Sequence, residues 1–145
     1  MANTWSDYGI ERMLKIALHT AESQPTAAKV ILLSSIPAAP VDVTLATGVT
    51  EVSAGNGYST GGLSVSLNST DLAHSDDTGN NRQDITLADQ QWTASGGSIT
   101  AAGAALVFTE GGTDYVWAIF DFGGTVTATA GGTFTLTNCE LRVGV

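Results

Sequence analysis

Aspartate and asparagine side chains crowd one stretch of the chain, residues 76–84, around a single glycine. Clustered carboxylate and amide oxygens on a glycine turn are ligands that calcium accepts. The stretch lacks EF-hand spacing and its closing bidentate glutamate, and Arg82 places a positive charge inside it. The sequence therefore favours an exposed, hydrated loop here, with a calcium site as the alternative, and we expect no metal and no other cofactor.

The remaining residues capable of chemistry form no catalytic pattern. His19 and His74 lie far apart in the sequence, and a triad is defined by geometry rather than by the presence of its residue types. No pair among the 14 acidic residues has a spacing that points to glycoside hydrolysis. Cys139 is the only cysteine, which excludes an intrachain disulfide and a C-x-x-C motif. We expect a protein that is not an enzyme.

Charged residues are scarce and mostly acidic. They make up 13% of the chain, against roughly a quarter in an ordinary soluble domain, and the formal net charge is −9. A nucleic-acid-binding protein needs a basic stripe, so this class is excluded. A surface this poor in charge is weak at keeping copies apart, which predicts that outer surface is buried against neighbouring proteins.

Targeting signals are not evident in the sequence. No apolar run reaches the roughly 20 residues that span a bilayer, so no membrane partner is expected. The first residues lack the basic start and apolar run of a signal peptide. We expect the protein to be made and assembled in a cytoplasm.

Short hydrophobic runs separated by glycine-rich turns dominate the chain after Pro25. The best strand patterns cover residues 29–34, 63–67, 98–109 and 115–122. Residues 68–84 have almost no apolar content, and we predict a long surface loop there. The pattern predicts one domain over residues 1–145, an all-β antiparallel sandwich or jelly roll formed by residues 25–145.

Residues 1–24 carry the only helical pattern, which predicts a short N-terminal helix and a linker. Thr4 and Asp7 fit a capping box at its start. One helix face is apolar and must be buried in the protein or in an interface. Its members are Ile10, Met13, Leu14, Ala17 and Leu18.

Aromatic residues supply the other interface candidates, Tyr58, Tyr115 and Trp117. Strict alternation over residues 115–122 places two mostly apolar sets on opposite faces. The first set is Tyr115, Trp117, Ile119 and Asp121, and the second is Val116, Ala118, Phe120 and Phe122. Core packing is the favoured interpretation, and an interface or an exposed carbohydrate platform is the alternative.

Three motifs in order carry a family resemblance. They are residues 51–58 (EVSAGNGY) leading into a strand at 63–65, residues 85–88 followed by Trp92 and two glycines, and residues 131–136 (GGTFTL). This order resembles small bacteriophage structural proteins with an EVSGGGYAR-like signature, a strand with a following Trp-Gly, and a late GDTFSF-like segment. The chain departs from that pattern at residues 59–60, which are Ser-Thr where the family has Ala-Arg, and in its longer polar stretch.

The resemblance implies a virion component without catalytic residues. Members are often labelled tail fibre or minor structural proteins, and head decoration (cement) proteins are a looser analogy. We expect a homo-oligomer, a trimer, on the capsid surface, bound to the major capsid protein and stabilising the shell. The alternative is a tail-fibre or baseplate component that contacts the host surface. A secreted hydrolase, a third class, is disfavoured by the missing signal peptide and site.

Overall fold

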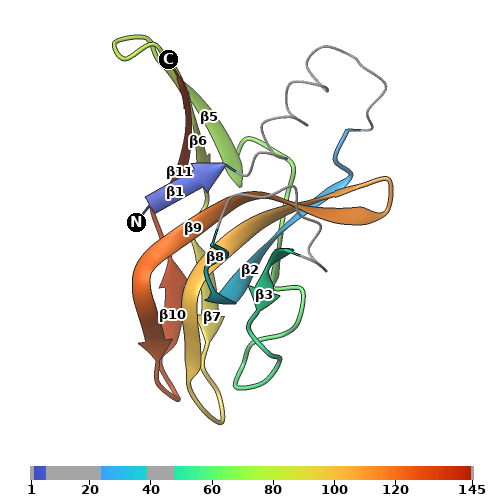
Figure 1. Ribbon diagram of the computed structural model, residues 1–145, viewed down its shortest axis with the longest axis vertical. Helices are drawn as coiled ribbons and strands as arrows, with labels where there is room; N and C mark the ends of the chain where they lie inside the picture. The colour runs from blue at the N-terminus through green and yellow to red at the C-terminus, as the bar shows by residue number, and fades with distance from the viewer. Residues whose placement is uncertain (1, 6–23, 39–47, 145) are drawn as a thin grey trace.

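The computed structural model describes residues 2–5, 24–38 and 48–144, and these are almost entirely β-structure in antiparallel sheets (Figure 1). The all-β sandwich class predicted from the sequence is therefore confirmed. The strands are β1 (Ala2–Trp5), β2 (Ala27–Ser35), β3 (Thr50–Glu51), β4 (Leu63–Val65), β5 (Leu72–Asp77), β6 (Arg82–Leu87), β7 (Gln90–Thr93), β8 (Ile99–Glu110), β9 (Thr113–Ala128), β10 (Thr133–Leu136) and β11 (Cys139–Gly144).

One large sheet forms the first layer, in the order β1-β9-β8-β2-β3, with β4 also paired to β2. Its centre is the hairpin of β8 and β9, whose turn at Gly111 and Gly112 has positive φ at both residues. Positive φ at both turn positions is the geometry that matches the twist of a tight hairpin, and glycine adopts it without strain. This hairpin curves from its turn down to the end of the molecule opposite β5 (Figure 1).

The second layer is one long antiparallel ladder that the structure divides in two. β6 pairs with β11 and β7 pairs with β10. The register is the same in both parts, because Leu87 lies opposite Cys139 and, three residues further along, Gln90 lies opposite Leu136. The ladder is interrupted only at residues 88–89 and 137–138, where Asn138 has a φ of 56°. Beyond the break, β5 joins β6 and β11 in a three-stranded sheet, which we call the arm (Figure 1).

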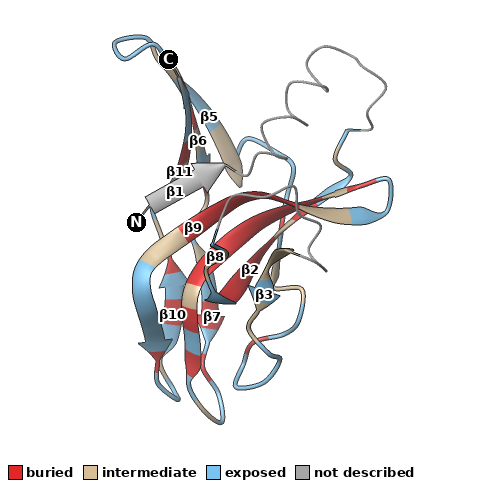
Figure 2. Ribbon diagram, viewed as in Figure 1, coloured by how far each residue is buried: buried red, intermediate tan, exposed pale blue. Residues whose placement is uncertain are grey.

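The main core lies between these two layers. The large sheet contributes Val30, Leu32, Leu106 and Phe120, among others, and the ladder contributes buried residues from both its parts. Those ladder residues are Leu87, Trp92, Phe134, Leu136, Cys139 and Leu141. Burial is concentrated on β8, β9 and β2 (Figure 2). This core therefore joins residues of all three sheets.

The opposite face of the large sheet is also apolar and buried. Ile31, Leu33, Val107 and Val116 are each 0% exposed and form a second cluster with Ala105 and Ile119. A sheet buried on both faces needs near-continuous hydrophobic strands, which explains the unbroken apolar run in residues 30–33.

A β-bulge at Trp117 corrects the predicted faces of strand β9. Leu106 pairs with Ala118 while Val107 pairs with Val116, so Trp117 is an extra residue on its strand. The bulge turns Trp117 to the same side as Ala118, and both lie in the main core, with Val116 and Ile119 on the other face. The prediction of strict alternation was wrong because one inserted residue reverses the faces of all that follow.

The polar stretch 68–84 is not a loop, contrary to the prediction. Most of it forms β5 and the start of β6, which pair from Leu72 opposite Leu87 to Asp77 opposite Arg82. Strand pairing needs backbone hydrogen bonds rather than apolar side chains, and neighbouring strands hold this hairpin in place. A pattern search that relies on hydrophobic alternation therefore misses it.

The N-terminal prediction is partly corrected as well. Thr4 and Trp5 do not start a helix, because they lie in β1, which pairs with residues 118–121 of β9. The edge of β9 supplies backbone partners there, which a local capping pattern does not foresee. The apolar stripe Ile10, Met13, Leu14, Ala17 and Leu18 lies outside the described residues.

A hydrogen-bonded clasp formed by residues 51–62 connects the two layers. The Tyr58 hydroxyl donates to Glu51 Oε1 (2.7 Å) and accepts from the Leu32 amide (3.1 Å) on β2. The Tyr58 ring packs on Trp92 of β7, with 6.2 Å between centroids. The backbone of Gly57 approaches so closely that a Cβ there would lie 2.0 Å from the Thr93 carbonyl oxygen. The motif that resembles the phage family is thus a structural clasp.

Tyr58→Phe tests the clasp. The variant leaves the buried Leu32 amide without its acceptor and removes one donor from Glu51, so the free energy of unfolding should fall by about 1–3 kcal/mol. Urea denaturation measures the change. Ser59→Ala, a change at an exposed neighbour, serves as the control and should stay within about 0.5 kcal/mol of wild type. Equal stability of the two variants would contradict the clasp.

Candidate functional site

The structure places two of the predicted interface residues in the protein interior. Tyr58 is 3% exposed and Trp117 is 7% exposed. Burial, together with the hydrogen bond to Glu51, raises the pKa of the Tyr58 hydroxyl, which stays protonated. Tyr115 is half-buried and packs against the main core. These aromatic residues support the fold rather than present a free contact surface.

The aromatic side chains of the core pack on one another. Trp117 stacks against Phe108, with 4.4 Å between centroids, and its Nε1–H donates to Glu110 Oε1 at 2.8 Å. Trp92 meets Phe134 edge to face at 6.3 Å. Core packing is thus confirmed for Trp92, Trp117 and Phe120, and these residues cannot form an exposed carbohydrate platform.

A small apolar cavity lies where the arm meets the large sheet. Its volume is about 160 Å³. It is lined by Leu72, His74, Ile85 and Leu141 of the arm and by Leu106, Phe108 and Trp117 of the large sheet. His74 is the only ionisable side chain in this lining, and its Nε2 lies 2.5 Å from Gln83 Oε1. The cavity therefore offers apolar contact and no set of groups for catalysis.

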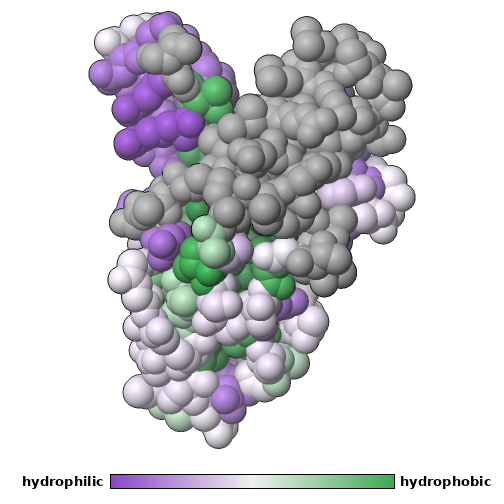
Figure 3. Space-filling view, viewed as in Figure 1, coloured by the Kyte–Doolittle hydropathy of each residue, from purple (hydrophilic) through white to green (hydrophobic). Residues whose placement is uncertain are grey.

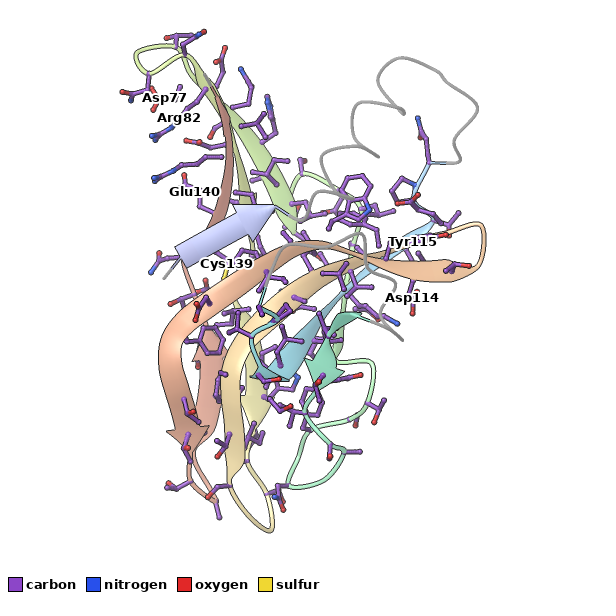
Figure 4. The ribbon with its side chains drawn as sticks, in the orientation of Figure 1. Asp77, Arg82, Asp114, Tyr115, Cys139 and Glu140 are labelled. Atoms are coloured by element: carbon purple, nitrogen blue, oxygen red, sulfur yellow. The ribbon has the colours of Figure 1, made fainter. Side chains whose placement is uncertain are left out.

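Ion pairs hold the three strands of the arm together. Arg82 lies 3.0 Å from Asp77 Oδ2 on β5 and 3.1 Å from Asp84 Oδ1 on its own strand. Arg142 on β11 lies 2.6 Å from Glu140 Oε2 and 3.9 Å from Asp84. The Asp84 carboxylate, 5% exposed, is thus compensated by two guanidinium groups. Figure 4 shows Asp77, Arg82 and Glu140 on the arm, far from Asp114 and Tyr115.

The predicted calcium ligands belong to this arm network. Asn80 donates to Asp77 Oδ2 at 2.7 Å, and this hydrogen bond, together with the Arg82 charge, lowers the pKa of Asp77 below its usual value. Asp76 accepts from Gln83 at 2.8 Å. Within the described ranges, no three His, Cys, Asp or Glu side chains converge where they could hold a metal ion. The arrangement favours a hydrogen-bonded hairpin over the calcium alternative.

Cys139 is held as a thiol in the core. It is 1% exposed, and burial, with a smaller effect of the Asp89 carboxylate, raises its pKa to about 12. A thiol that does not ionise near neutral pH is a poor nucleophile. His19, the other histidine, lies outside the described residues.

We call the large sheet together with β7 and β10 the body of the protein. Charged side chains of the body are engaged in internal bonds. Lys29 pairs with Asp114, which also accepts from Thr109 at 2.6 Å. Partial burial by itself raises the pKa of Asp114, but the hydrogen bonds from Lys29 and Thr109 outweigh it and leave that pKa below its usual value. Asp121 accepts from the Gly123 amide at 2.8 Å. These charges stabilise local structure.

The end of the body opposite the arm carries no charge. We call it the distal end, and it consists of the turns at residues 53–61, 94–98 and 129–132 with the strand ends that lead to them. None of the residues 52–70, 90–109 and 122–139 is charged. In Figure 3 the strongly hydrophilic colour gathers on the arm, whereas the distal end is mostly pale. The few charged residues of the chain are thus kept away from this end by the fold.

Comparison with known proteins adds no relative. No protein-family model, no curated protein and no solved structure matches the chain. The likeness to phage structural proteins therefore depends on the sequence motifs. No helix in the described part of the chain has the length and apolar character needed to cross a bilayer.

Calcium should leave the stability of this protein unchanged. Because Arg82 and Asn80 already occupy the Asp77 carboxylate, millimolar calcium and EDTA should give the same thermal midpoint, within about 1 °C. Differential scanning calorimetry of the full chain measures it. A rise of several degrees with calcium that Asp77→Ala abolishes, and Asp71→Ala retains, would establish a calcium site on the arm.

Proposed function

We propose that this chain is a structural protein of a bacteriophage particle, a decoration protein that binds the major capsid protein and stabilises the shell. The observation that carries the proposal is the charge-free distal end of a protein whose net charge is −9. The motif resemblance, which implies a virion component, supports the same class of function. The protein acts in this proposal by contact, without catalysis.

The distal end suits a broad, static contact with a neighbouring protein. Its exposed residues are mainly small hydroxyl, amide and glycine residues, which form hydrogen bonds without the desolvation penalty of buried charges. Interface cores are depleted in charged residues, whereas the rim stays polar. With the distal end on the shell, the acidic arm projects away from it into solvent (Figure 3).

A polar cavity on the arm supports the second candidate, a tail-fibre or baseplate component that contacts the host surface. The cavity has a volume of about 350 Å³. Its lining offers carboxylate, hydroxyl, amide and guanidinium groups, which suit a hydroxylated ligand such as a glycan. The lining residues are Asp76, Thr78, Asn81, Arg82, Gln83 and Val143.

Copy number and heat resistance of particles distinguish the two candidates. A decoration protein should occur at a ratio close to one per major capsid protein, and particles lacking it should release DNA at a lower temperature. Quantitative mass spectrometry of purified particles and a DNA-release melt measure both quantities. A handful of copies, with intact heads and lost adsorption, would overturn the decoration proposal in favour of the tail.

Two matched variants test which end makes the contact. Ala130→Asp places a negative charge in an exposed turn of the distal end, and Thr78→Asp places the same charge at the tip of the arm. Binding of labelled protein to particles that lack it should weaken at least about tenfold with Ala130→Asp and stay unchanged with Thr78→Asp. The reverse result would assign the contact to the arm.

A further inference from the structure

The outer edge of β9 is only partly covered by another strand. β1 pairs with this edge antiparallel from Ala118 to Asp121. Beyond Asp121, no strand in the described ranges pairs with β9 on that side, and residues 123–127 are exposed. A Cβ built on Gly123 or Gly124 would meet nothing within 4 Å. Several residues of β9 therefore present backbone groups to solvent along this edge.

An apolar groove accompanies the uncovered edge, where the two layers of the sandwich stay apart. Its volume is about 290 Å³. Phe122 and Phe134 face each other across the layers, with 5.9 Å between centroids, and Val126 is 46% exposed. The lining residues are Phe122, Val126, Phe134, Thr135, Leu136 and Thr137, none of which is charged.

This edge lacks the charged residues and prolines that commonly block strand pairing. Proteins block exposed edges with lysine, proline or inward-pointing charges, and residues 122–139 contain none of these. The stretch between Asp121 and Val126 is irregular, since β8 and β9 shift their register between Ala101 and Gly103. Past it, residues 126–128 pair regularly with residues 99–101. The edge of β9 there is a regular, uncharged strand, and β1 shows that the same edge accepts an antiparallel strand.

We propose that a second copy of this chain docks here, with the β9 edges of the two copies pairing antiparallel about a twofold axis and Val126 of each copy near that axis. A second copy is the occupant that the charges favour. Each copy carries −9, so a contact between copies is least repulsive where neither brings a charge. A twofold contact is also self-complementary, since each copy offers the same edge and groove to the other.

The proposed contact differs from the trimer expected from the sequence, because a twofold edge pairing closes after two copies. It is independent of the proposed function, since it concerns the contact between copies and not the particle to which they bind. The distal turns remain free in such a pair to contact another protein.

Sedimentation velocity of the full chain, over a concentration series, tests the proposal. The wild type should show a concentration-dependent dimer. Val126→Lys brings two like charges together at the twofold contact and should weaken dimerisation at least about tenfold. Leu67→Lys is the matched control, because Leu67 is also 46% exposed and gains the same charge away from this edge, so it should dimerise like wild type.

Hydrogen exchange locates the contact in the same samples. Amides of residues 122–128 should exchange more slowly in concentrated than in dilute wild-type protein, and this protection should be absent in Val126→Lys. Circular dichroism checks that the variant folds, and Thr135→Lys on β10 provides a second charged variant beside the groove. A wild type that stays monomeric, or an oligomer that Val126→Lys and Thr135→Lys both leave intact, would overturn the proposal.

Discussion

The two layers of this sandwich meet at one buried tyrosine, whose hydroxyl group bonds the large sheet and whose ring packs on the ladder. The Tyr58 hydroxyl accepts a hydrogen bond from the Leu32 amide and donates one to Glu51, both in the large sheet. The Tyr58 ring packs against Trp92 of the ladder. Residues 51–62 can reach these partners only because Gly57 and Gly62 allow the backbone to approach neighbouring carbonyl groups closely. A side chain at Gly62 would place its Cβ 1.8 Å from the Val30 carbonyl oxygen. One short segment thus contacts both layers of the sandwich.

The interruption of the ladder has a different consequence. On one side of residues 88–89 and 137–138, strands β7 and β10 pack over the large sheet and contribute Trp92 and Phe134 to the core. On the other side, the same register continues in β6 and β11 of the arm. There, polar side chains replace apolar ones, and ion pairs replace part of the apolar packing. One ladder thus builds both an apolar layer and a charged projection. The segregation of charge thus coincides with the division of the ladder into two parts.

A body end without charge and an arm rich in charge favour a protein that associates in a fixed orientation. The exposed β9 edge adds a surface on which a second copy can pair, because nothing in residues 122–139 repels it. Strand pairing and hydrogen bonds from hydroxyl-rich turns are contacts of modest strength. The overall binding becomes strong when many copies make such contacts on one surface.

Hydrophobic patterning by itself determined the fold class and several of the strands. Residues 29–34, 63–67, 98–109 and 115–122 were identified as strands from their apolar runs, and each overlaps an observed strand, because burial imposes those patterns locally. The tertiary structure alone decided three other features. The bulge at Trp117 reverses the faces of β9, the polar residues 72–77 become a strand through their neighbours, and Thr4 and Trp5 pair with β9 instead of starting a helix. Each of these depends on a backbone partner that is distant or displaced in the sequence, and local patterns carry no information about such partners.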